Sequence, residues 1–355
     1  MSQESPPYTK QARWIYYIGY IGGDVLHAIL REFPRLRQSS ITCLVRTQQG
    51  GELLRRTYPS LDIVQGDLAN LGLLEDLASS ADIVLHCASI EDVASSRALA
   101  QGLARRRQRS GPAFYICTSG TDILSIDTIH ARNYGEPTSG KVYDDWDGLE
   151  KVLSLPDDSP HKEVEDVQRA ASSPRVKVAI VCAPCVYGRG SGCGNQRSIQ
   201  LPDLTRYVIE RGTAFTVGRG LSRWSNVHIH DLSDIYVLLV GQALTGGGGG
   251  ATWGRDGYYF AENGAHVWSE VAGKVAREAQ AQGLVDSVVD VVSWSPGEEA
   301  DKHLDCCTLF YGTDSVCRAD RARRLLGWSP RWHSIEQEVA LTLAAEARKK
   351  ESSII

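Results

Sequence analysis

Gly19 and Gly22 lie three residues apart just after the first apolar run of the chain, residues 13–18, and a helical pattern begins at Gly23. Glycines in such a strand-to-helix turn let the backbone approach a pyrophosphate, which the helix N-terminus attracts. Tyr16 stands where the first glycine of this fingerprint belongs, and its Cβ crowds the turn. The turn therefore predicts a dinucleotide site in which Tyr16 restricts the room. Its contacts would be Gly19, Tyr20, Ile21 and Gly22.

Residues at the ends of later apolar runs fit the rest of such a cofactor. Arg46 ends the second run, where an acidic residue would bind the ribose hydroxyls of NAD. A guanidinium there suits a 2′-phosphate, so we expect NADP(H) rather than NAD(H), with a solvated strand-end arginine as the alternative. Asp67 follows the third run, within reach of an adenine amino group. The remaining predicted contacts are Leu68, Cys87, Ala88 and Ser89.

The elements that would position these residues are short β-rich runs that alternate with amphipathic helical patterns. The runs are residues 13–18, 40–45, 63–64, 83–86, 113–118 and 176–182. Such alternation is typical of βαβ units and a parallel sheet. We predict an α/β fold with a Rossmann-type, doubly wound parallel sheet over residues 12–184.

The pattern becomes less regular after residue 181. A glycine-rich segment at residues 188–192 precedes a predicted helix at residues 203–211. We predict a smaller C-terminal α/β domain that shapes the substrate pocket, residues 185–345. The glycine run 246–250 predicts a flexible surface loop that does not pack. An aromatic pocket lining is one use for four tryptophans, and core packing is the expected one. These are Trp224, Trp253, Trp268 and Trp294.

The overall composition excludes several classes of partner. The 355 residues carry a formal net charge of -5, so no basic field attracts nucleic acid or anionic lipid. The nine cysteines are scattered, several in apolar runs, as is typical of reduced intracellular thiols. No stretch approaches the length of a membrane span. We therefore expect a cytoplasmic protein with a small-molecule substrate, without nucleic acid or membrane as partner; the sequence does not indicate the oligomeric state.

Short motifs recur along residues 13–332 in one chain order. They are GYIGG (19–23), GDL (66–68), ICTSG (116–120), CVYG (185–188), NVHIHDL (226–232) and RRLLGW (323–328). Together they resemble the extended short-chain dehydrogenase/reductase superfamily, in its nucleotide-sugar epimerase and NmrA-like branches. VYDDWDG (142–148) and GNQRSIQ (194–200) resemble fungal NAD-dependent epimerase/dehydratase-like proteins. The resemblance implies an enzyme of fungal secondary metabolism, and a second domain that is interleaved with the core near residues 226–240.

In that superfamily a tyrosine phenol transfers the proton, a lysine four residues later lowers the phenol's pKa, and a serine or threonine polarises the substrate oxygen. None of the 14 tyrosines of this chain has a lysine four positions on. The hydroxyl partner survives as Ser119, with Thr118 beside it, at the end of the fifth run. The resemblance therefore implies a site that kept its serine and lost its tyrosine and lysine.

Two places could hold a replacement for the missing acid. Tyr143 lies at the expected distance from the serine along the chain. Asp147 rather than a lysine follows it four residues later, so the Tyr143 phenol should stay near its ordinary pKa of about 10. A packed or surface tyrosine is the alternative reading. Helix register instead selects Lys162 and Asp166. His161 titrates near neutrality, yet we expect an ordinary exposed turn residue there.

No metal site is expected. His228 and His230 precede Asp231, which the family comparison makes a hinge between the domains, and metal sites need more converging ligands. Cys182-x-x-Cys185 lacks a second pair at metal-binding spacing. The acidic cluster within residues 144–150 is expected to be a solvated loop.

Three functions remain open. The first is an oxidoreductase or epimerase with NADP(H) held at Gly19, Gly22 and Arg46, acting on a small carbonyl or alcohol near Ser119. The second keeps the fold but catalyses a non-redox isomerisation, dehydration or cyclisation. The third is a non-enzymatic cofactor sensor of NmrA type. We favour them in this order.

Overall fold

The structure is a computed structural model that describes residues 14–17, 19–38, 41–106, 111–136, 140–285 and 290–352. The side chains of residues 14–17, 351 and 352 lie outside this description. Within the described part of the chain, no helix combines the length and the apolar character needed to cross a membrane.

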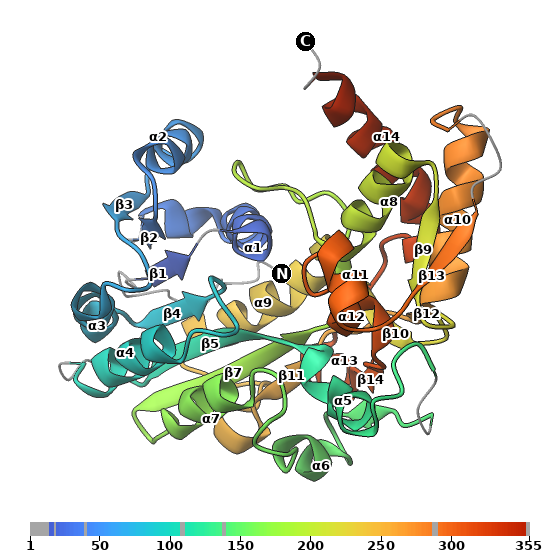
Figure 1. Ribbon diagram of the computed structural model, residues 1–355. Coiled ribbons are helices and arrows are strands. Elements are labelled where there is room, and N and C mark those ends of the chain that lie inside the picture. Colours follow the sequence, from blue (N-terminus) through green and yellow to red (C-terminus); the bar gives the residue numbers. More distant parts are fainter. Residues whose placement is uncertain are drawn as a thin grey trace, which may run out of the picture.

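A seven-stranded sheet organises the first half of the chain (Figure 1). Its order is β11-β7-β5-β4-β1-β2-β3, and every neighbouring pair is parallel. The order reverses between β1 and β4, as in a doubly wound fold, so the predicted Rossmann-type sheet is confirmed. The strands are β1 (Trp14–Tyr17), β2 (Ile41–Val45), β3 (Asp62–Gln65), β4 (Ile83–His86), β5 (Ala113–Gly120), β7 (Val176–Ala183) and β11 (Tyr258–Phe260).

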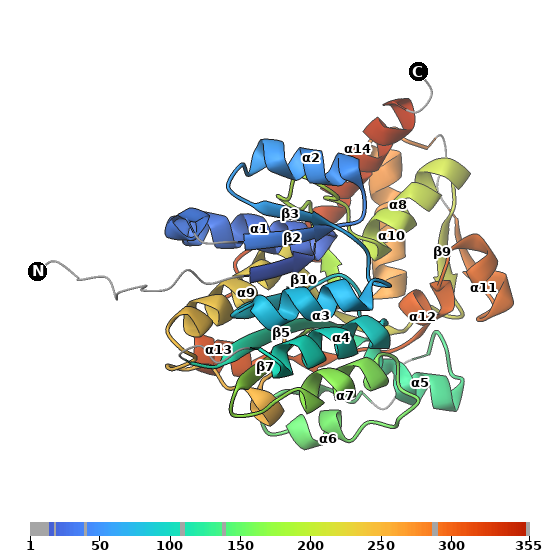
Figure 2. The same ribbon diagram turned by 90° about the vertical axis from the view of Figure 1, so that its left-hand side faces the viewer.

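Helices cover both faces of this sheet. On one face α3, α4 and α7 lie side by side, and on the other α1 packs along α9 (Figures 1 and 2). Helix α1 begins at Tyr20, earlier than the expected start at Gly23, and buries an apolar stripe that includes Val25 and Ile29. The helices are α1 (Tyr20–Glu32), α2 (Gln48–Thr57), α3 (Leu71–Ser80), α4 (Val93–Ala104), α7 (Lys162–Ala170) and α9 (Ile229–Leu244).

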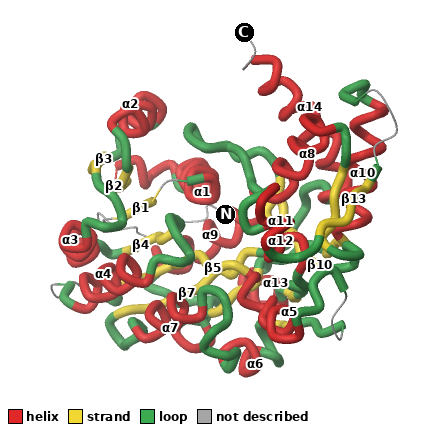
Figure 3. Tube along the Cα trace, in the orientation of Figure 1, coloured by secondary structure: helices red, strands yellow, loops and turns green. Residues whose placement is uncertain are grey.

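The second half of the chain builds smaller sheets around a separate cluster of buried apolar side chains. The strands pair as β8 (Cys185–Tyr187) with β10 (Arg223–His228) and β12 (Ala265–Val267), and as β9 (Ala214–Val217) with β13 (Val291–Trp294). Around them lie α8 (Gln200–Arg211), α10 (Trp268–Ala281), α11 (Glu298–His303), α12 (Cys307–Gly312) and α14 (Ile335–Ser352). Residues 188–199 form a long loop between β8 and α8 (Figure 3). Trp224, Trp268 and Trp294 are buried in this second core, so core packing is their use.

Segments of the second half also return to the first. Helix α9 packs against α1, β11 forms the edge of the main sheet beside β7, and β14 (Cys317–Arg318) pairs with β6 (Tyr143–Asp144). Helix α13 (Asp320–Leu326) contacts both α9 and β11. The remaining short helices are α5 (Ile126–Ala131), α6 (Leu149–Leu153) and three 3-10 turns, η1 (Pro34–Gln38), η2 (Thr121–Ser125) and η3 (Gly254–Asp256). The division at residues 12–184 and 185–345 stays a prediction.

The glycine run 246–250 lies at the surface, but the expectation that it does not pack is wrong. The N–H groups of Gly246 and Gly247 donate to carbonyls in the last turn of α9. A Cβ on Gly247 would lie 2.7 Å from the Phe114 ring, and one on Gly250 would lie 2.0 Å from the main-chain oxygen of Leu325. The run lets the chain pass close to two other segments, which explains its lack of side chains.

Candidate functional site

The predicted cofactor residues gather at one edge of the main sheet. Because the strands are parallel, their carboxyl ends share that edge. Gly19 precedes α1, Arg46 follows β2, Asp67 follows β3, and Cys87 follows β4. Strand β5 ends at the same edge with Thr118 and Ser119. The carboxyl edge beside the point of strand-order reversal is where doubly wound folds bind ligands.

The turn before α1 leaves space around Gly19. Gly19 is extended, and a Cβ built on it would meet no atom within 4 Å. The first helical hydrogen bond runs from the N–H of Gly23 to the oxygen of Gly19, at 2.8 Å. The N–H groups in the first turn of a helix have no partner within the helix, so they can serve an anion. These groups belong to Tyr20, Ile21 and Gly22.

The loop 188–199 lies against this same helix. The Tyr20 hydroxyl donates to the Gly188 oxygen at 2.6 Å, and the Ser191 N–H donates to Asp24 Oδ1 at 2.6 Å. The side chain of Tyr20 is therefore engaged, and its backbone N–H is the group left for a cofactor. The side chain of Tyr16 lies outside the described residues, so its restriction of the turn stays a prediction.

Arg46 has the surroundings expected of an anion contact. Its side chain is exposed. The next residue, Thr47, caps α2 by accepting the N–H of Gly50 at 3.1 Å. Arg46 thus lies beside the positive end of a second helix, which favours negative charge.

The other predicted cofactor contacts have mixed roles. Asp67 closes a turn, because its Oδ1 accepts the N–H groups of Ala69 and Asn70 at 3.0 and 3.2 Å. Leu68 packs against the main core, Ala88 is exposed, and Ser89 Oγ accepts the N–H of Glu91 at 3.1 Å. Cys87 is half-buried, and burial raises the pKa of its thiol to about 11. The Cys87 thiol is therefore protonated and not a nucleophile at neutral pH.

Ser119 contacts a buried acid that the sequence motifs did not single out. Its hydroxyl donates to Glu165 Oε1 at 2.5 Å, and the Tyr258 hydroxyl donates to the same oxygen at 2.8 Å. Glu165 comes from α7 and Tyr258 from β11, and both are almost fully buried. Burial raises the pKa of Glu165, although both hydrogen bonds and the charges of Arg169 and His161 oppose this. The pair Ser119 and Glu165 can therefore hold or release a proton in a dry environment.

The expectation that His161 is an exposed turn residue is wrong. Its Nε2 lies 2.6 Å from Asp122 Oδ2, and the two side chains are only 6% and 8% exposed. Asp122 lies in η2, directly after β5, and this turn carries the carboxylate over the start of α7. Burial lowers the pKa of His161, but the hydrogen bond and charge of Asp122, helped by Glu91 and Glu165, raise it overall. The His161 imidazole, which lies close to the Ser119 network, therefore keeps its proton to a higher pH than an ordinary histidine.

Thr118 does not share the surroundings of Ser119. Its Oγ1 lies 2.6 Å from the Tyr236 hydroxyl of α9, whereas Ser119 contacts α7. Successive side chains of a strand point to opposite faces, so the two neighbours serve different sides of the sheet. Ser119 is the one that lies beside the titratable groups.

Tyr143 is placed in β6, and its hydroxyl donates to Asp127 Oδ2 at 3.3 Å. Within the described residues, no hydrogen bond joins it to Ser119 or Glu165. A cation is near it after all, because the Lys141 ammonium lies 4.4 Å from the ring centre. Burial raises the pKa of Tyr143, and Lys141 offsets only part of this.

Lys162 and Asp166, the candidates selected by helix register, pair with each other. The ammonium lies 2.6 Å from both carboxylate oxygens, and the lysine side chain is 7% exposed. The register therefore places this ion pair on α7, while the residue that reaches Ser119 from the same helix is Glu165.

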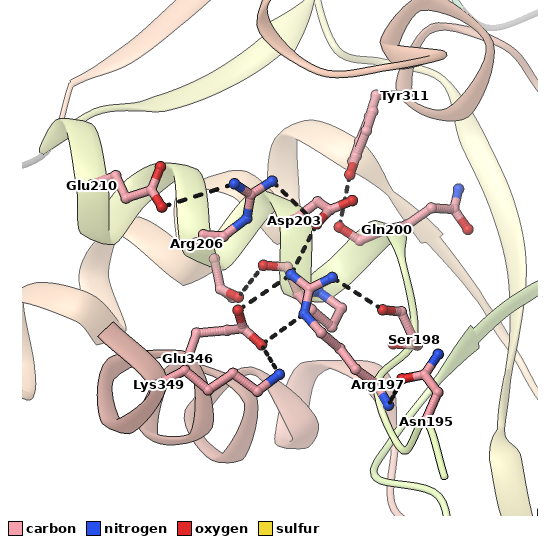
Figure 4. Close-up of polar contacts among 12 residues, drawn as sticks. Asn195, Arg197, Ser198, Gln200, Asp203, Arg206, Glu210, Tyr311, Glu346 and Lys349 are labelled. Atoms are coloured by element: carbon pink, nitrogen blue, oxygen red, sulfur yellow. Dashed lines mark hydrogen bonds and ion pairs between the residues drawn. The ribbon is translucent and has the colours of Figure 1, made fainter. Parts of the chain in front are cut away.

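The two fungal-type motifs connect distant segments. Arg197 lies 2.9 and 3.2 Å from the two oxygens of Glu346 in α14, and 2.8 Å from Asp203 in α8 (Figure 4). Asp145 is fully buried, where a solvated loop residue was expected. It accepts the N–H groups of Phe260 and Arg321, both at 2.8 Å, and burial raises its pKa to about 6. Arg197 is thus neutralised, and Asp145 anchors β11 and α13 to the first half.

The fold and the strand-edge site define the class: the chain has the fold of the NAD-dependent epimerases and dehydratases, within the extended short-chain dehydrogenase/reductases. It is 38% identical over 340 residues to the oxidase ucsJ of Acremonium sp., a match that covers 93% of this chain and 96% of that protein. The chain therefore belongs to the family of this oxidase. An uncharacterized protein of Saccharomyces cerevisiae is 22% identical, with 90% and 95% covered. No protein-family model matches the chain.

Solved structures show the same fold. The dTDP-glucose 4,6-dehydratase DesIV from Streptomyces venezuelae, with NAD and TYD bound, has a TM-score of 0.66 at 18% identity and covers 96% of this chain and 98% of its own. UDP-glucuronic acid 4-epimerase from Bacillus cereus, in complex with UDP-glucuronic acid and NAD, has a TM-score of 0.60 at 12% identity, with 96% and 99% covered. At these identities the likeness is one of fold.

Proposed function

We propose that the protein binds NADP(H) at the carboxyl edge of the sheet and oxidises or reduces a small alcohol or carbonyl compound beside Ser119. The observation that carries this proposal is the buried hydrogen bond from Ser119 to Glu165 at the end of β5. The fungal relative named an oxidase and the NAD complexes of the structural neighbours support it.

The residues present fit the cofactor. The open turn at Gly19 and the first-turn N–H groups of α1 would hold the pyrophosphate, and Arg46 would hold the 2′-phosphate. Cys87, Ala88 and Ser89 would lie along it after β4. When bound, NADP(H) supplies or accepts the hydride. Because Arg46 is predicted to contact the 2′-phosphate, the proposed cofactor is NADP(H) rather than the NAD that the structural neighbours bind.

Ser119 and Glu165 would transfer the proton that accompanies the hydride. For oxidation of an alcohol, Ser119 Oγ accepts the hydroxyl proton of the substrate while its own proton passes to Glu165 Oε1. For reduction, the same proton returns along the same path. When His161 is protonated, its charge lowers the pKa of Glu165 and so favours the anionic form of Glu165 before the transfer. This arrangement does the work that the superfamily assigns to a tyrosine and a lysine.

We also propose a cytoplasmic location, because all nine cysteines are free thiols. The substrate would be a small molecule, and nothing in the net charge of -5 favours nucleic acid.

The test is a titration of the purified protein with NADPH and with NADH, followed by nicotinamide fluorescence and by thermal unfolding. We expect NADPH to bind and to bind more tightly than NADH. Arg46→Asp should weaken NADPH binding about 10- to 100-fold, since a charge-assisted hydrogen bond contributes about 1.5–3 kcal/mol. Arg56→Asp, an exposed arginine of the neighbouring helix, is the matched control and should leave the preference unchanged.

Binding of neither nucleotide would reject both the redox proposal and the sensor alternative. Binding with no hydride transfer to any carbonyl compound would favour the sensor. Turnover of a substrate with unchanged nicotinamide absorbance would favour the non-redox alternative.

A further inference from the structure

Three side chains that can ligate metals converge from segments far from Ser119 in the sequence. His228 ends β10, His333 lies just before α14, and Glu338 lies in the first turns of α14. One donor atom of each lies within 4.8 Å of the donor atoms of the others. His228 and Glu338 are buried, and His333 is half-buried. Two imidazoles and one carboxylate are a ligand set that zinc uses in proteins.

Each of these residues contacts a neighbour. The ring of His228 stacks on Trp332, with centroids 4.7 Å apart and an angle of 6° between the planes. The main-chain oxygen of His333 accepts the Tyr187 hydroxyl at 2.7 Å. Glu338 Oε1 accepts the Thr342 hydroxyl at 3.2 Å, which orients the other oxygen toward His333. Such supporting contacts are typical of metal ligands, whose orientation they fix.

Two of the donor atoms already contact each other. His333 Nε2 lies 2.5 Å from Glu338 Oε2. A Cβ on Gly188 would lie 2.3 Å from His228 Nε2, so only glycine at this position lets the His228 ring keep its place beside the other two residues. His228 Nδ1 accepts the N–H of His230 at 3.2 Å, and coordination through Nε2 gives up only this one long hydrogen bond.

We propose that His228, His333 and Glu338 bind a divalent transition-metal ion of the zinc type. The ion would replace the proton between His333 and Glu338 and draw His228 Nε2 toward it, with ligand distances of about 2.0–2.2 Å. Three protein ligands leave one tetrahedral position for water or a small ligand. Trp332, which stacks on His228, also lines a neighbouring cavity of about 440 Å³ together with Ser191 and His230.

The alternative is a purely structural cluster in which His333 and Glu338 form a hydrogen bond that fastens the loop before α14. The two readings differ in what the full-length protein binds. A structural cluster binds no ion at micromolar concentration, whereas the proposed site binds one per chain. The cofactor proposal plays no part in this difference, so either proposal can fail alone.

The experiment uses the full chain without a histidine tag, stripped with a chelator and dialysed against micromolar Zn²⁺ at pH 7.5. We expect about one equivalent of zinc per chain by elemental analysis, and a visible absorption band when Co²⁺ is used as the probe. Glu338→Gln and His333→Ala should each weaken Zn²⁺ binding at least tenfold. His130→Ala is the matched control, because His130 is an exposed histidine that also lies beside a carboxylate, Asp158, at 2.9 Å.

Circular dichroism of each variant shows whether it is folded, and the wild-type measurement stands even if a variant unfolds. Wild-type protein that retains less than a tenth of an equivalent of zinc would overturn the proposal. So would unchanged zinc binding in a folded Glu338→Gln variant.

Discussion

The Glu165→Gln substitution gives a stability test of the Ser119 network that needs no knowledge of the substrate. The amide keeps an oxygen that can accept from Ser119 and Tyr258 but cannot ionise. Because burial raises the pKa of Glu165, the folded protein retains a proton that the unfolded chain releases. The stability due to that proton is fully present below the unfolded pKa of about 4.3 and is lost as pH rises through the folded pKa.

Each unit by which the pKa is raised corresponds to about 1.4 kcal/mol of stability lost by the wild type across this window. At low pH both proteins carry a neutral group with the same hydrogen-bond partners, and their free energies of unfolding should agree within about 1 kcal/mol. As pH rises, the variant should become progressively more stable than the wild type.

The assay is urea unfolding from pH 4.5 to 8.5, followed by the fluorescence of the eight tryptophans. Glu163→Gln, an exposed glutamate on the same helix, is the control and should show a difference that does not vary with pH. If the Glu165→Gln difference were equally flat, the pKa of Glu165 would not be raised in the folded protein, and the reasoning from its burial would be refuted.

Two further substitutions test contacts between segments. Gly250→Ala should destabilise the protein by about 1–3 kcal/mol, because the new Cβ would lie 2.0 Å from a main-chain oxygen of α13. Gly248→Ala is the control: its Cβ would meet no atom within 4 Å, so the unfolding midpoint should change little. Arg197→Ala should cost about 2–4 kcal/mol, because it leaves the nearly buried Glu346 without its guanidinium. Arg206→Ala, at a 44% exposed arginine of α8, should change stability by less than about 1 kcal/mol, and equal effects of the two arginines in chemical denaturation would contradict this assignment.

The sheet could be predicted because its inner strands are continuous apolar runs, and each expected run corresponds to a strand of the structure. β11 was missed for a physical reason. It is only three residues long, and its place beside β7 depends on the buried carboxylate of Asp145, which lies 115 residues away from Phe260. No local pattern contains that information.

The site was predictable only in part. Ser119 could be found because it ends a recognisable strand, but Glu165 lies 46 residues further on, and nothing in the segment 161–167 distinguishes it from its charged neighbours. Burial alone separates them: Glu165 is 3% exposed, whereas Glu163 faces the solvent. The expectation for His161 was wrong for a similar reason. Its hydrogen-bond partner, Asp122, belongs to a turn 39 residues earlier in the sequence.

The edge strand β11 also has a consequence for synthesis on the ribosome. When residue 184 has been made, the N-terminal sheet is complete except for this strand, and β7 presents an unpaired edge. At about 5–20 residues per second, roughly 4–15 s pass before residues 258–260 follow. During that interval the nascent chain carries an open strand edge at β7, and Asp145 has not yet formed its hydrogen bond with Phe260. A chaperone that binds exposed strand edges would therefore bind the nascent chain rather than the finished protein.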